Sequence, residues 1–167
     1  MNNNKKWTAL YTRPRHEFKA EEQLTELRVE HYLPTITRVK QWSDRKKKIV
    51  EPVFKSYIFI FSDEKERLAA LQQNAIVKSV TFAGKPAVIP EIQIENLKQM
   101  ISSNREIYIS NRIQVGTRVR VIDGPFEGIE GVVYHTDRKE EMLAINIDLL
   151  NRSVSVQLPK ESVTKIA

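Results

Sequence analysis

Residues 115–133 read VGTRVRVIDGPFEGIEGVV, and this stretch is the most informative part of the sequence for the fold. Val119 and Val121 alternate with polar residues, which is the pattern of a strand with one buried face. Residues 123–125 (Asp-Gly-Pro) favour a tight turn, and the later glycines of the stretch permit a sharp bend into a second strand. These features would also suit many small β-barrels.

The rest of the C-terminal third continues with short strands of the same period. We expect strands at residues 117–122, 129–135, 142–149, 153–158 and 163–166. So many short strands in so few residues predict a small five-stranded barrel, which leaves no exposed sheet edge. The preceding segment, residues 104–114, is polar and predicts a linker, although residues 107–109 could pair locally.

The N-terminal part mixes helical and strand patterns. The sequence predicts strands at residues 7–11, 31–39, 49–61 and 77–82, and helices starting at Pro14, at 63–73 and at 90–103. Asp63 is the expected N-cap of the second helix, with Leu68 and Leu71 facing the core. The order of elements predicts an antiparallel sheet with flanking helices, and therefore an α+β fold class. We expect one domain at 1–103, a linker at 104–114 and a second domain at 115–167.

Composition excludes several kinds of function. The chain has 167 residues, no cysteine and three scattered histidines, so neither a thiol nucleophile nor a metal site is expected. No apolar run is long enough to span a bilayer, and the polar N-terminus does not resemble a signal peptide, which favours the cytoplasm. The net charge of +6 favours a polyanionic partner, although many basic proteins simply carry solvated lysines.

The stretch at residues 115–133 resembles a KOW motif across its whole length. The residues that carry this likeness are Gly116, Val119, Val121, Gly124, Phe126, Gly128 and Gly131. Upstream, residues 7–11 (WTALY), 51–60 (EPVFKSYIFI) and 84–90 (GKPAVIP) resemble the NGN domain of the NusG family of transcription factors. The resemblance covers roughly residues 6–166. It implies an NGN domain followed by a KOW barrel of the SH3-like kind.

Within that family the chain is similar to the RfaH-like and UpxY-like antiterminators, which act on particular operons. The resemblance rests on residues 51–54 leading into Tyr57 and on residues 82–90. One feature departs from the RfaH pattern. Where RfaH has a His-Thr-Thr run on its second helix, this chain has Arg67-Leu68-Ala69, so any contact with the polymerase gate loop must be made differently or be weaker.

The resemblance implies that an apolar depression beside the NGN sheet binds the clamp helices of the largest RNA polymerase subunit. The matching positions are Tyr11, Tyr57, Phe59, Phe82, Leu97 and Met100. Aromatic side chains in a shallow groove are well suited to binding, because they bury a large area at low entropic cost. The same side chains could instead be ordinary core.

Two groups of basic residues are candidates for contact with nucleic acid. The first follows the opening strand: Arg13, Arg15, His16 and Lys19, where Arg15 and Lys19 have the spacing of one helix face. The second lies on the predicted hairpin arm: Arg38, Lys40, Trp42, Arg45, Lys46, Lys47 and Lys48. Cations around an aromatic ring suit phosphates with a stacked base. The resemblance implies non-template or upstream DNA as the ligand. The alternative for both groups is a solvated basic surface.

The family resemblance further implies that the KOW domain recruits either the termination factor Rho or a small-subunit ribosomal protein. Nothing in the sequence chooses between the two. We expect a monomer without membrane contact, without cofactor and without enzymatic chemistry, because no phosphate loop or catalytic carboxylate pair is present. A ribosome-associated or RNA-binding KOW protein is the rival interpretation.

Overall fold

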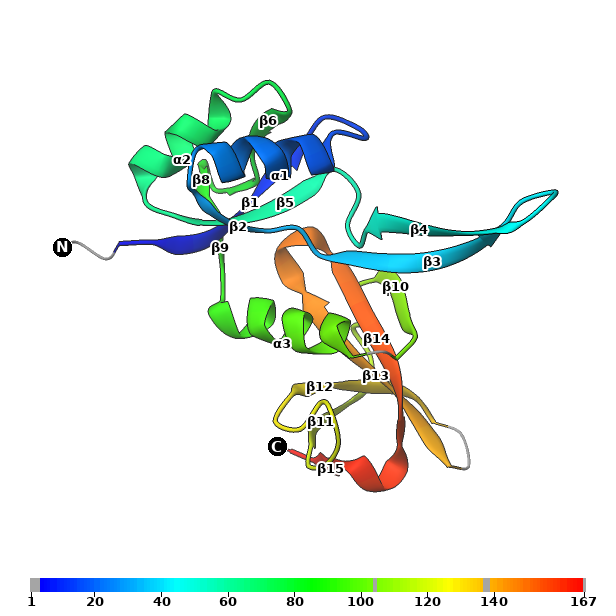
Figure 1. Cartoon of the computed structure of the whole chain (residues 1–167). Helices are drawn as coiled ribbons and strands as arrows, with labels where there is room; N and C mark the ends of the chain where they lie inside the picture. The colour runs from blue at the N-terminus through cyan, green and yellow to red at the C-terminus, as the bar shows by residue number, and fades with distance from the viewer. Residues whose placement is uncertain (1–3, 104, 137–138, 167) are drawn as a thin grey trace. The chain divides into compact units, whose positions relative to one another are not determined.

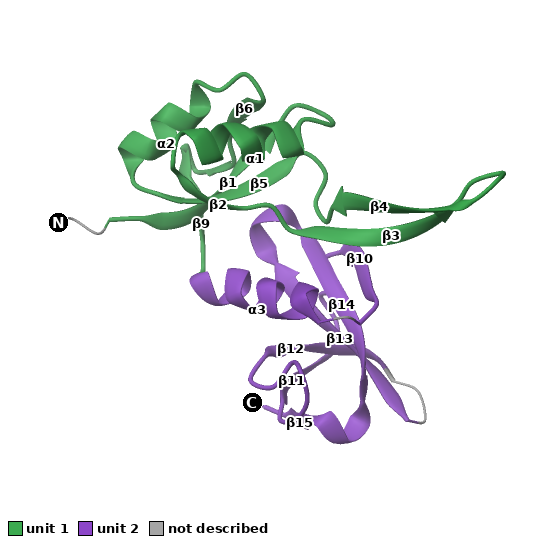
Figure 2. Cartoon of the chain, in the orientation of Figure 1, with its two compact units in different colours: residues 1–90 green, residues 91–167 purple. Residues whose placement is uncertain are grey.

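The computed structural model describes residues 4–103, 105–136 and 139–166. The chain divides into two compact units, residues 1–90 and residues 91–167 (Figure 2). The ends of the predicted domains and linker at residues 1, 104 and 167 lie outside the described residues. Helices and antiparallel strands occur together, so the fold class is α+β, as predicted (Figure 1).

The first unit is built on a five-stranded sheet with two small hairpins. Its elements are β1 (Lys6–Thr12), α1 (Glu17–Glu26), β2 (Glu30–Tyr32), β3 (Thr35–Gln41), β4 (Lys46–Pro52), β5 (Tyr57–Ser62), α2 (Glu64–Leu71), β6 (Ile76–Ser79), β7 (Thr81–Phe82), β8 (Lys85–Pro86) and β9 (Val88–Ile89). The sheet has the order β2-β5-β1-β6, and β9 also pairs with β1. The other strands form the hairpins β3–β4 and β7–β8.

Helices α1 and α2 lie on the same side of this sheet (Figure 1). The core beneath them joins Leu10, Ile58 and Ile60 of the sheet to Leu24 of α1 and Ala70 of α2, all fully buried. Leu10 pairs directly with Ile58 in the β1–β5 register. Because side chains alternate across a strand, the neighbouring residues of β1 and β5 face the opposite side of the sheet.

Two predicted long strands are each broken in the structure. The predicted strand 31–39 ends at Tyr32 and resumes as β3 beyond Pro34, while the predicted strand 49–61 stops at Pro52 and resumes at Tyr57. Proline has no N–H to donate, so it favours a strand end. At the second break Ser56 has φ 67°, a left-handed conformation that an extended strand does not accommodate. The breaks separate the β3–β4 arm from the main sheet.

Helix α2 begins as predicted and buries a different face. Asp63 is its N-cap, accepting a hydrogen bond from the Glu66 N–H at 2.8 Å, and Glu66 accepts one from the Asp63 N–H at 3.0 Å. This reciprocal pair is a capping box. The prediction that Leu68 faces the core was wrong, because Leu68 is exposed and Ala70 fills that place, with Leu71 packed beside it.

The second unit contains one α-helix and a six-stranded sheet. Its elements are α3 (Glu91–Ser102), β10 (Ile107–Asn111), β11 (Thr117–Val121), β12 (Glu130–Thr136), β13 (Glu140–Ile147), a short 3-10 turn (Asp148–Leu150), β14 (Arg152–Pro159), a second 3-10 turn (Lys160–Ser162) and β15 (Val163–Lys165). The strand order is β10-β14-β13-β12-β11-β15. All five strands expected from the sequence are present in this sheet.

Two elements outside the predicted barrel belong to the same unit. Strand β10, which lies within the predicted linker, pairs with β14 from Ile107 opposite Val156 to Asn111 opposite Arg152. Helix α3 buries Ile94, Leu97 and Met100 and contacts β13. The compact units therefore divide between Pro90 and Glu91, before the boundary expected at residue 103. The functional domain limits stay a prediction.

Candidate binding surfaces

The face of the first sheet opposite α1 and α2 carries a cluster of aromatic side chains, which we call the aromatic face. It consists of Trp7 and Tyr11 of β1, Tyr32 of β2, Phe54, and Tyr57, Phe59 and Phe61 of β5. The β1–β5 register places Tyr11 opposite Tyr57, with ring centroids 4.9 Å apart, and Trp7 opposite Phe61 at 5.4 Å.

Side chains of the aromatic face differ in exposure. Phe59 is fully buried and is packed against Phe54 edge-on, with ring centroids 6.1 Å apart. Tyr11 and Tyr57 are only half-buried, and the Lys78 ammonium lies 5.3 Å from the Tyr11 ring centroid. The aromatic face thus combines the buried Phe54 and Phe59 with two partly exposed tyrosines. This arrangement suits a docking surface in which the tyrosines make contact.

Sequence reasoning found three members of this face, Tyr11, Tyr57 and Phe59, and missed the other four. The available signal was the alternation within β1 and β5, which puts Trp7 beside Tyr11 and Phe61 beside Phe59 on the same side. Tyr32 could not be found in this way, because its place depends on the pairing of β2 with β5, opposite Phe59.

Phe82 of the predicted docking set lies on a separate hairpin. It is 79 % exposed and pairs with Lys85 across the β7–β8 turn. The two turn residues, Ala83 and Gly84, both have positive φ, at 51° and 76°. Such a turn matches the twist of the strands it joins and holds the Phe82 ring out from the backbone.

Leu97 and Met100, also predicted for docking, belong to the second unit. Both are fully buried on α3 together with Ile94. In this structure they are core residues of that unit, so their side chains are not exposed for contact with a partner. That Leu97 and Met100 bind the polymerase together with the tyrosines stays a prediction.

The basic residues after β1 surround the start of α1. Arg13, Arg15 and Lys19 are exposed, and His16 is half-buried with its Nδ1 2.9 Å from the carbonyl oxygen of Pro14. The helix begins at Glu17, not at Pro14 as predicted. Arg15 has φ 64° and lies outside the helix, so the helical spacing of Arg15 and Lys19 does not place them on one face.

The hairpin arm β3–β4 carries the second basic group. Its strands pair from Thr35 opposite Pro52 to Gln41 opposite Lys46, and the Trp42 N–H donates to the Arg45 carbonyl at 2.7 Å to close the tip (Figure 1). All seven predicted contact residues are exposed. The Lys47 ammonium lies 4.8 Å from the Trp42 ring centroid, which is a cation–π contact.

The two faces of the arm are both basic, and one of them also carries a carboxylate. On one face Glu51 forms an ion pair with Arg38, with 2.7 Å between Nε and Oε1, and lies 4.0 Å from Lys40. On the other face Lys46 and Lys48 stand beside the exposed Val39. Lys47 is paired with Lys40 and lies on the first face, so both faces keep a net positive charge.

The glycines at 116–131 are required by the backbone for two different reasons. Gly124 and Gly128 have φ of 86° and 90°, which favours glycine. A Cβ on Gly116 or Gly131 would lie 2.5 Å from a backbone oxygen of the neighbouring strand. The prediction that Gly131 serves a sharp bend was therefore wrong, because its role is to allow β12 to approach β13 closely. Val119, Val121 and Phe126 fill the core of this unit.

Comparison with known proteins identifies the family of this chain. Residues 5–98 match the family model described as "Transcription termination factor nusG". This match covers more than half of the chain. The chain belongs to the NusG family. It is accordingly a transcription factor of the NusG type.

Individual members of the NusG family resemble the chain over nearly its full length. "Transcription termination/antitermination protein NusG" of Lactococcus lactis is 27% identical, covering 96% of this chain and 92% of that protein. The protein of the same name from Rickettsia typhi is 23% identical, covering 98% and 92%. The solved structure "Domain interaction in Thermotoga maritima NusG" aligns with a TM-score of 0.57 at 21% identity, covering 98% of both chains, which shows a shared fold.

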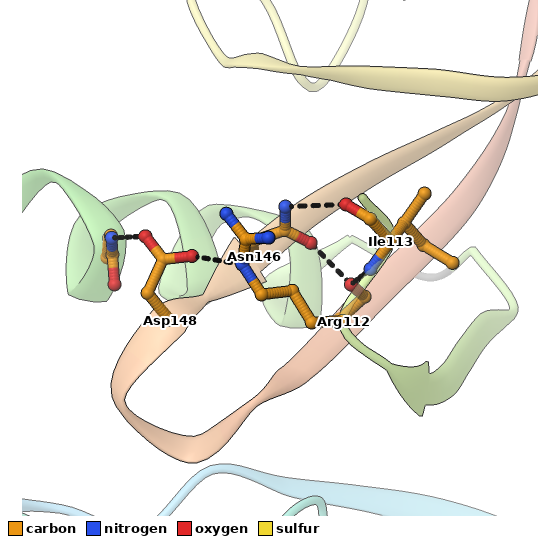
Figure 3. A network of polar contacts seen from close by, with 6 residues as sticks. Arg112, Ile113, Asn146 and Asp148 are labelled. Atoms are coloured by element: carbon orange, nitrogen blue, oxygen red, sulfur yellow. Dashed lines mark hydrogen bonds and ion pairs between the residues drawn. The ribbon is translucent and has the colours of Figure 1, made fainter. Parts of the chain in front are cut away.

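A polar network joins the segment after β10 to the six-stranded sheet of this NusG-family chain (Figure 3). The Arg112 guanidinium donates to Asp148 at 2.6 Å, and Asp148 also accepts from Gln93 of α3 at 3.2 Å. The Ile113 N–H donates to Ser153 at 2.9 Å, and Asn146 donates to the Ile113 carbonyl at 3.1 Å. Ser153 is fully buried. The network fixes residues 112–113 against β13 and β14.

The described residues, 4–103, 105–136 and 139–166, offer neither a metal site nor a membrane-spanning helix. Within those ranges, no cluster of three or more His, Cys, Asp or Glu side chains could hold a metal ion. None of the described helices is long and apolar enough to cross a membrane.

Proposed function

We propose that this protein binds RNA polymerase through the aromatic face and suppresses pausing or termination during elongation. The proposed polymerase element is the clamp helices of the largest subunit, as the family resemblance implies. No covalent chemistry is involved. The place of action would then be the bacterial cytoplasm, where the polymerase works.

The observation that carries this proposal is the cross-strand pairing of the half-buried Tyr11 and Tyr57 on the same sheet face as the buried Phe59. Tyrosine presents a large rigid ring with a polar tip, which is typical of side chains that dominate protein interfaces. The side chain of Lys78 beside Tyr11 adds a cation at the edge of the surface. An amphipathic helical partner with acidic residues at its margin would fit this arrangement.

Contact with nucleic acid is a second component of the proposal. The arm and the start of α1 carry exposed cations, and the exposed ring of Trp42 at the arm tip is available for stacking on an unpaired base. Non-template or upstream DNA at the transcription bubble is the proposed ligand. Binding there would hold the factor on the elongating complex.

The barrel of the second unit is proposed to recruit a further partner, either Rho or a small-subunit ribosomal protein. Two binding sites on one chain raise the local concentration of the second site without requiring new contacts. The same proposal includes action on particular operons, as in RfaH-like and UpxY-like proteins. This part rests on the resemblance at residues 51–54 and 82–90.

The first experiment is a pull-down of core RNA polymerase by the full chain and by Tyr57→Ala. Tyr134→Ala is the matched control, because Tyr134 is an exposed tyrosine of the second unit. We expect Tyr57→Ala to weaken binding by roughly 2 kcal/mol or more, as for an aromatic hot spot, and Tyr134→Ala to leave it unchanged. Native circular dichroism of both variants is the folding control.

A rival function, binding to ribosomes or RNA as a KOW protein, is favoured by the basic arm alone. If the full chain retains ribosomes or RNA and ignores polymerase, the polymerase proposal is wrong and the rival takes its place. Equal polymerase binding by wild type and Tyr57→Ala would place the docking surface elsewhere.

A further inference from the structure

Glu17 is the only charged side chain that is buried in the described part of the chain. It is the first residue of α1 and is 6% exposed. Burying a carboxylate costs free energy unless its oxygens accept hydrogen bonds. An acidic residue in the first turn stabilises a helix through the helix dipole, but this effect does not require burial. The burial of Glu17 therefore points to a more specific role.

The hydrogen-bond partner of Glu17 is the backbone just before β5. Its Oε1 accepts a hydrogen bond from the Ser56 N–H at 2.9 Å. The carbonyl oxygen of Ser56 accepts one from the Thr12 N–H, also at 2.9 Å. The start of α1 and the end of β1 thus hold Ser56 between them.

Ser56 is the third residue of a tight turn that runs from Phe54 to Tyr57. The Tyr57 N–H donates to the Phe54 carbonyl oxygen at 3.4 Å, and Ser56 has φ 67°. A positive φ at this place is a feature of type II turns, which favour glycine there. A serine adopts the left-handed conformation only at a cost in free energy, so the surrounding contacts must hold it. The hydrogen bond to Glu17 is one of these contacts.

Both ends of this turn belong to the aromatic face. Phe54 packs edge-on against Phe59, and Tyr57 lies opposite Tyr11 with ring centroids 4.9 Å apart. If Ser56 left the left-handed conformation, the direction of the chain into β5 would change, and the Tyr57 ring would move relative to Tyr11. The geometry of the tyrosine pair therefore depends on a hydrogen bond from a helix on the opposite side of the sheet.

We propose that Glu17 is a positioning residue for docking. It holds Ser56 in the left-handed conformation, so that Tyr57 lies beside Tyr11 before a partner arrives. This role rests on the docking to RNA polymerase proposed above. A surface that is already ordered loses less free energy on binding than one that must be ordered by the partner. The role requires an oxygen acceptor at position 17 and does not require the negative charge.

Four variants of the full chain separate this role from a general effect on α1. Glu17→Ala removes the acceptor, whereas Glu17→Gln keeps an acceptor oxygen and removes the charge. Glycine adopts a positive φ without strain, so Ser56→Gly combined with Glu17→Ala should restore the turn. Glu22→Ala is the matched control, since Glu22 is exposed on the same helix.

The first measurement is the contact between the two tyrosine rings in the protein alone. Nuclear Overhauser effects between Tyr11 and Tyr57 should be lost or weakened in Glu17→Ala. They should remain in Glu17→Gln and Glu22→Ala and return in the double variant. Unchanged ring contacts in Glu17→Ala would overturn the proposal. A double variant that behaves like Glu17→Ala would also overturn it, because glycine at position 56 relieves only a loss that acts through the turn.

The second measurement is the affinity of each variant for core RNA polymerase. Glu17→Ala should weaken binding roughly tenfold, the effect of losing one hydrogen bond to a charged group. Glu17→Gln and the double variant should bind within about threefold of wild type, because each keeps the turn. Native circular dichroism of every variant is the folding control.

Tyr57→Ala distinguishes a failure of this role from a failure of the docking function. If Tyr57→Ala weakens polymerase binding and Glu17→Ala does not, the docking function stands and the positioning role of Glu17 is refuted. If Tyr57→Ala binds polymerase as wild type does, the docking function itself is wrong. The ring contacts in the free protein then still report whether Glu17 sets the position of Tyr57.

Discussion

Glu17 is a buried carboxylate that joins two parts of the first unit. The residue is 6% exposed, and its Oε1 accepts a hydrogen bond from the Ser56 N–H at 2.9 Å, at the left-handed residue before β5. We expect Glu17→Ala to lower the free energy of unfolding by about 1–3 kcal/mol, because the Ser56 N–H loses its partner. Chemical denaturation measures this. Glu22→Ala, exposed on the same helix, should change little.

Gly131 and Gly124 should respond differently to alanine. At Gly124 a Cβ meets no atom within 4 Å, so only the positive φ is strained, at about 1–2 kcal/mol. At Gly131 the Cβ would lie 2.5 Å from the Ala144 carbonyl oxygen, so β12 and β13 must separate, and the loss should reach about 3 kcal/mol or more. Urea denaturation of the two variants compares them, and equal losses would contradict the close approach.

The ion pair between Glu64 and Arg67 can be tested by pH titration. Its pKa is lowered from the usual 4.5, mainly by the hydrogen bond from Arg67. A carboxyl with a depressed pKa in the folded state stabilises the protein above its unfolded pKa, and this contribution is lost as pH falls through the lower, folded value. We expect side-chain carbon NMR to show Glu64 titrating below 4.5 and returning towards it in Arg67→Gln. An unchanged titration would show that the pair does not persist in solution.

At the level of elements, the arm should determine how binding to nucleic acid depends on salt. Each lysine that neutralises a phosphate of a single strand contributes about 0.7 to the slope of log affinity against log salt. Replacing Lys46, Lys47 and Lys48 by glutamine should therefore reduce the slope by roughly 2, if all three contact phosphate. Fluorescence anisotropy at several salt concentrations gives the slope. Lys98→Gln in α3 is a control that removes a single charge outside the arm, and it should leave the slope unchanged.

Elements with a regular local pattern could be predicted from the sequence. The alternation around Val119 and Val121 predicted strands of the second unit, and Asp63 marked the start of α2. Elements that depend on distant pairing could not be predicted. Strand β10 forms because Ile107 pairs with Val156, far along the chain, and the local sequence around it is polar. Likewise, the alternation within residues 7–11 and 57–61 indicated part of the aromatic face. The place of Tyr32 depends only on the pairing of β2 with β5.

On the scale of the whole molecule, the division of the chain assigns α3 to the second unit. Leu97→Ala should destabilise that unit by about 2–5 kcal/mol, since Leu97 is fully buried there. Hydrogen exchange should accelerate in β13 and remain unchanged in β1 and β5. Faster exchange confined to the first unit would show that α3 belongs there instead.

The position of the unit boundary also determines how modules of this chain can be exchanged with those of relatives. A cut after residue 103 would separate the apolar stripe of Ile94, Leu97 and Met100 from the strand it covers. Each half of such a chimera would then expose hydrophobic surface and would tend to aggregate. A cut at Pro90 keeps helix and barrel together, so recombination there should yield soluble hybrids.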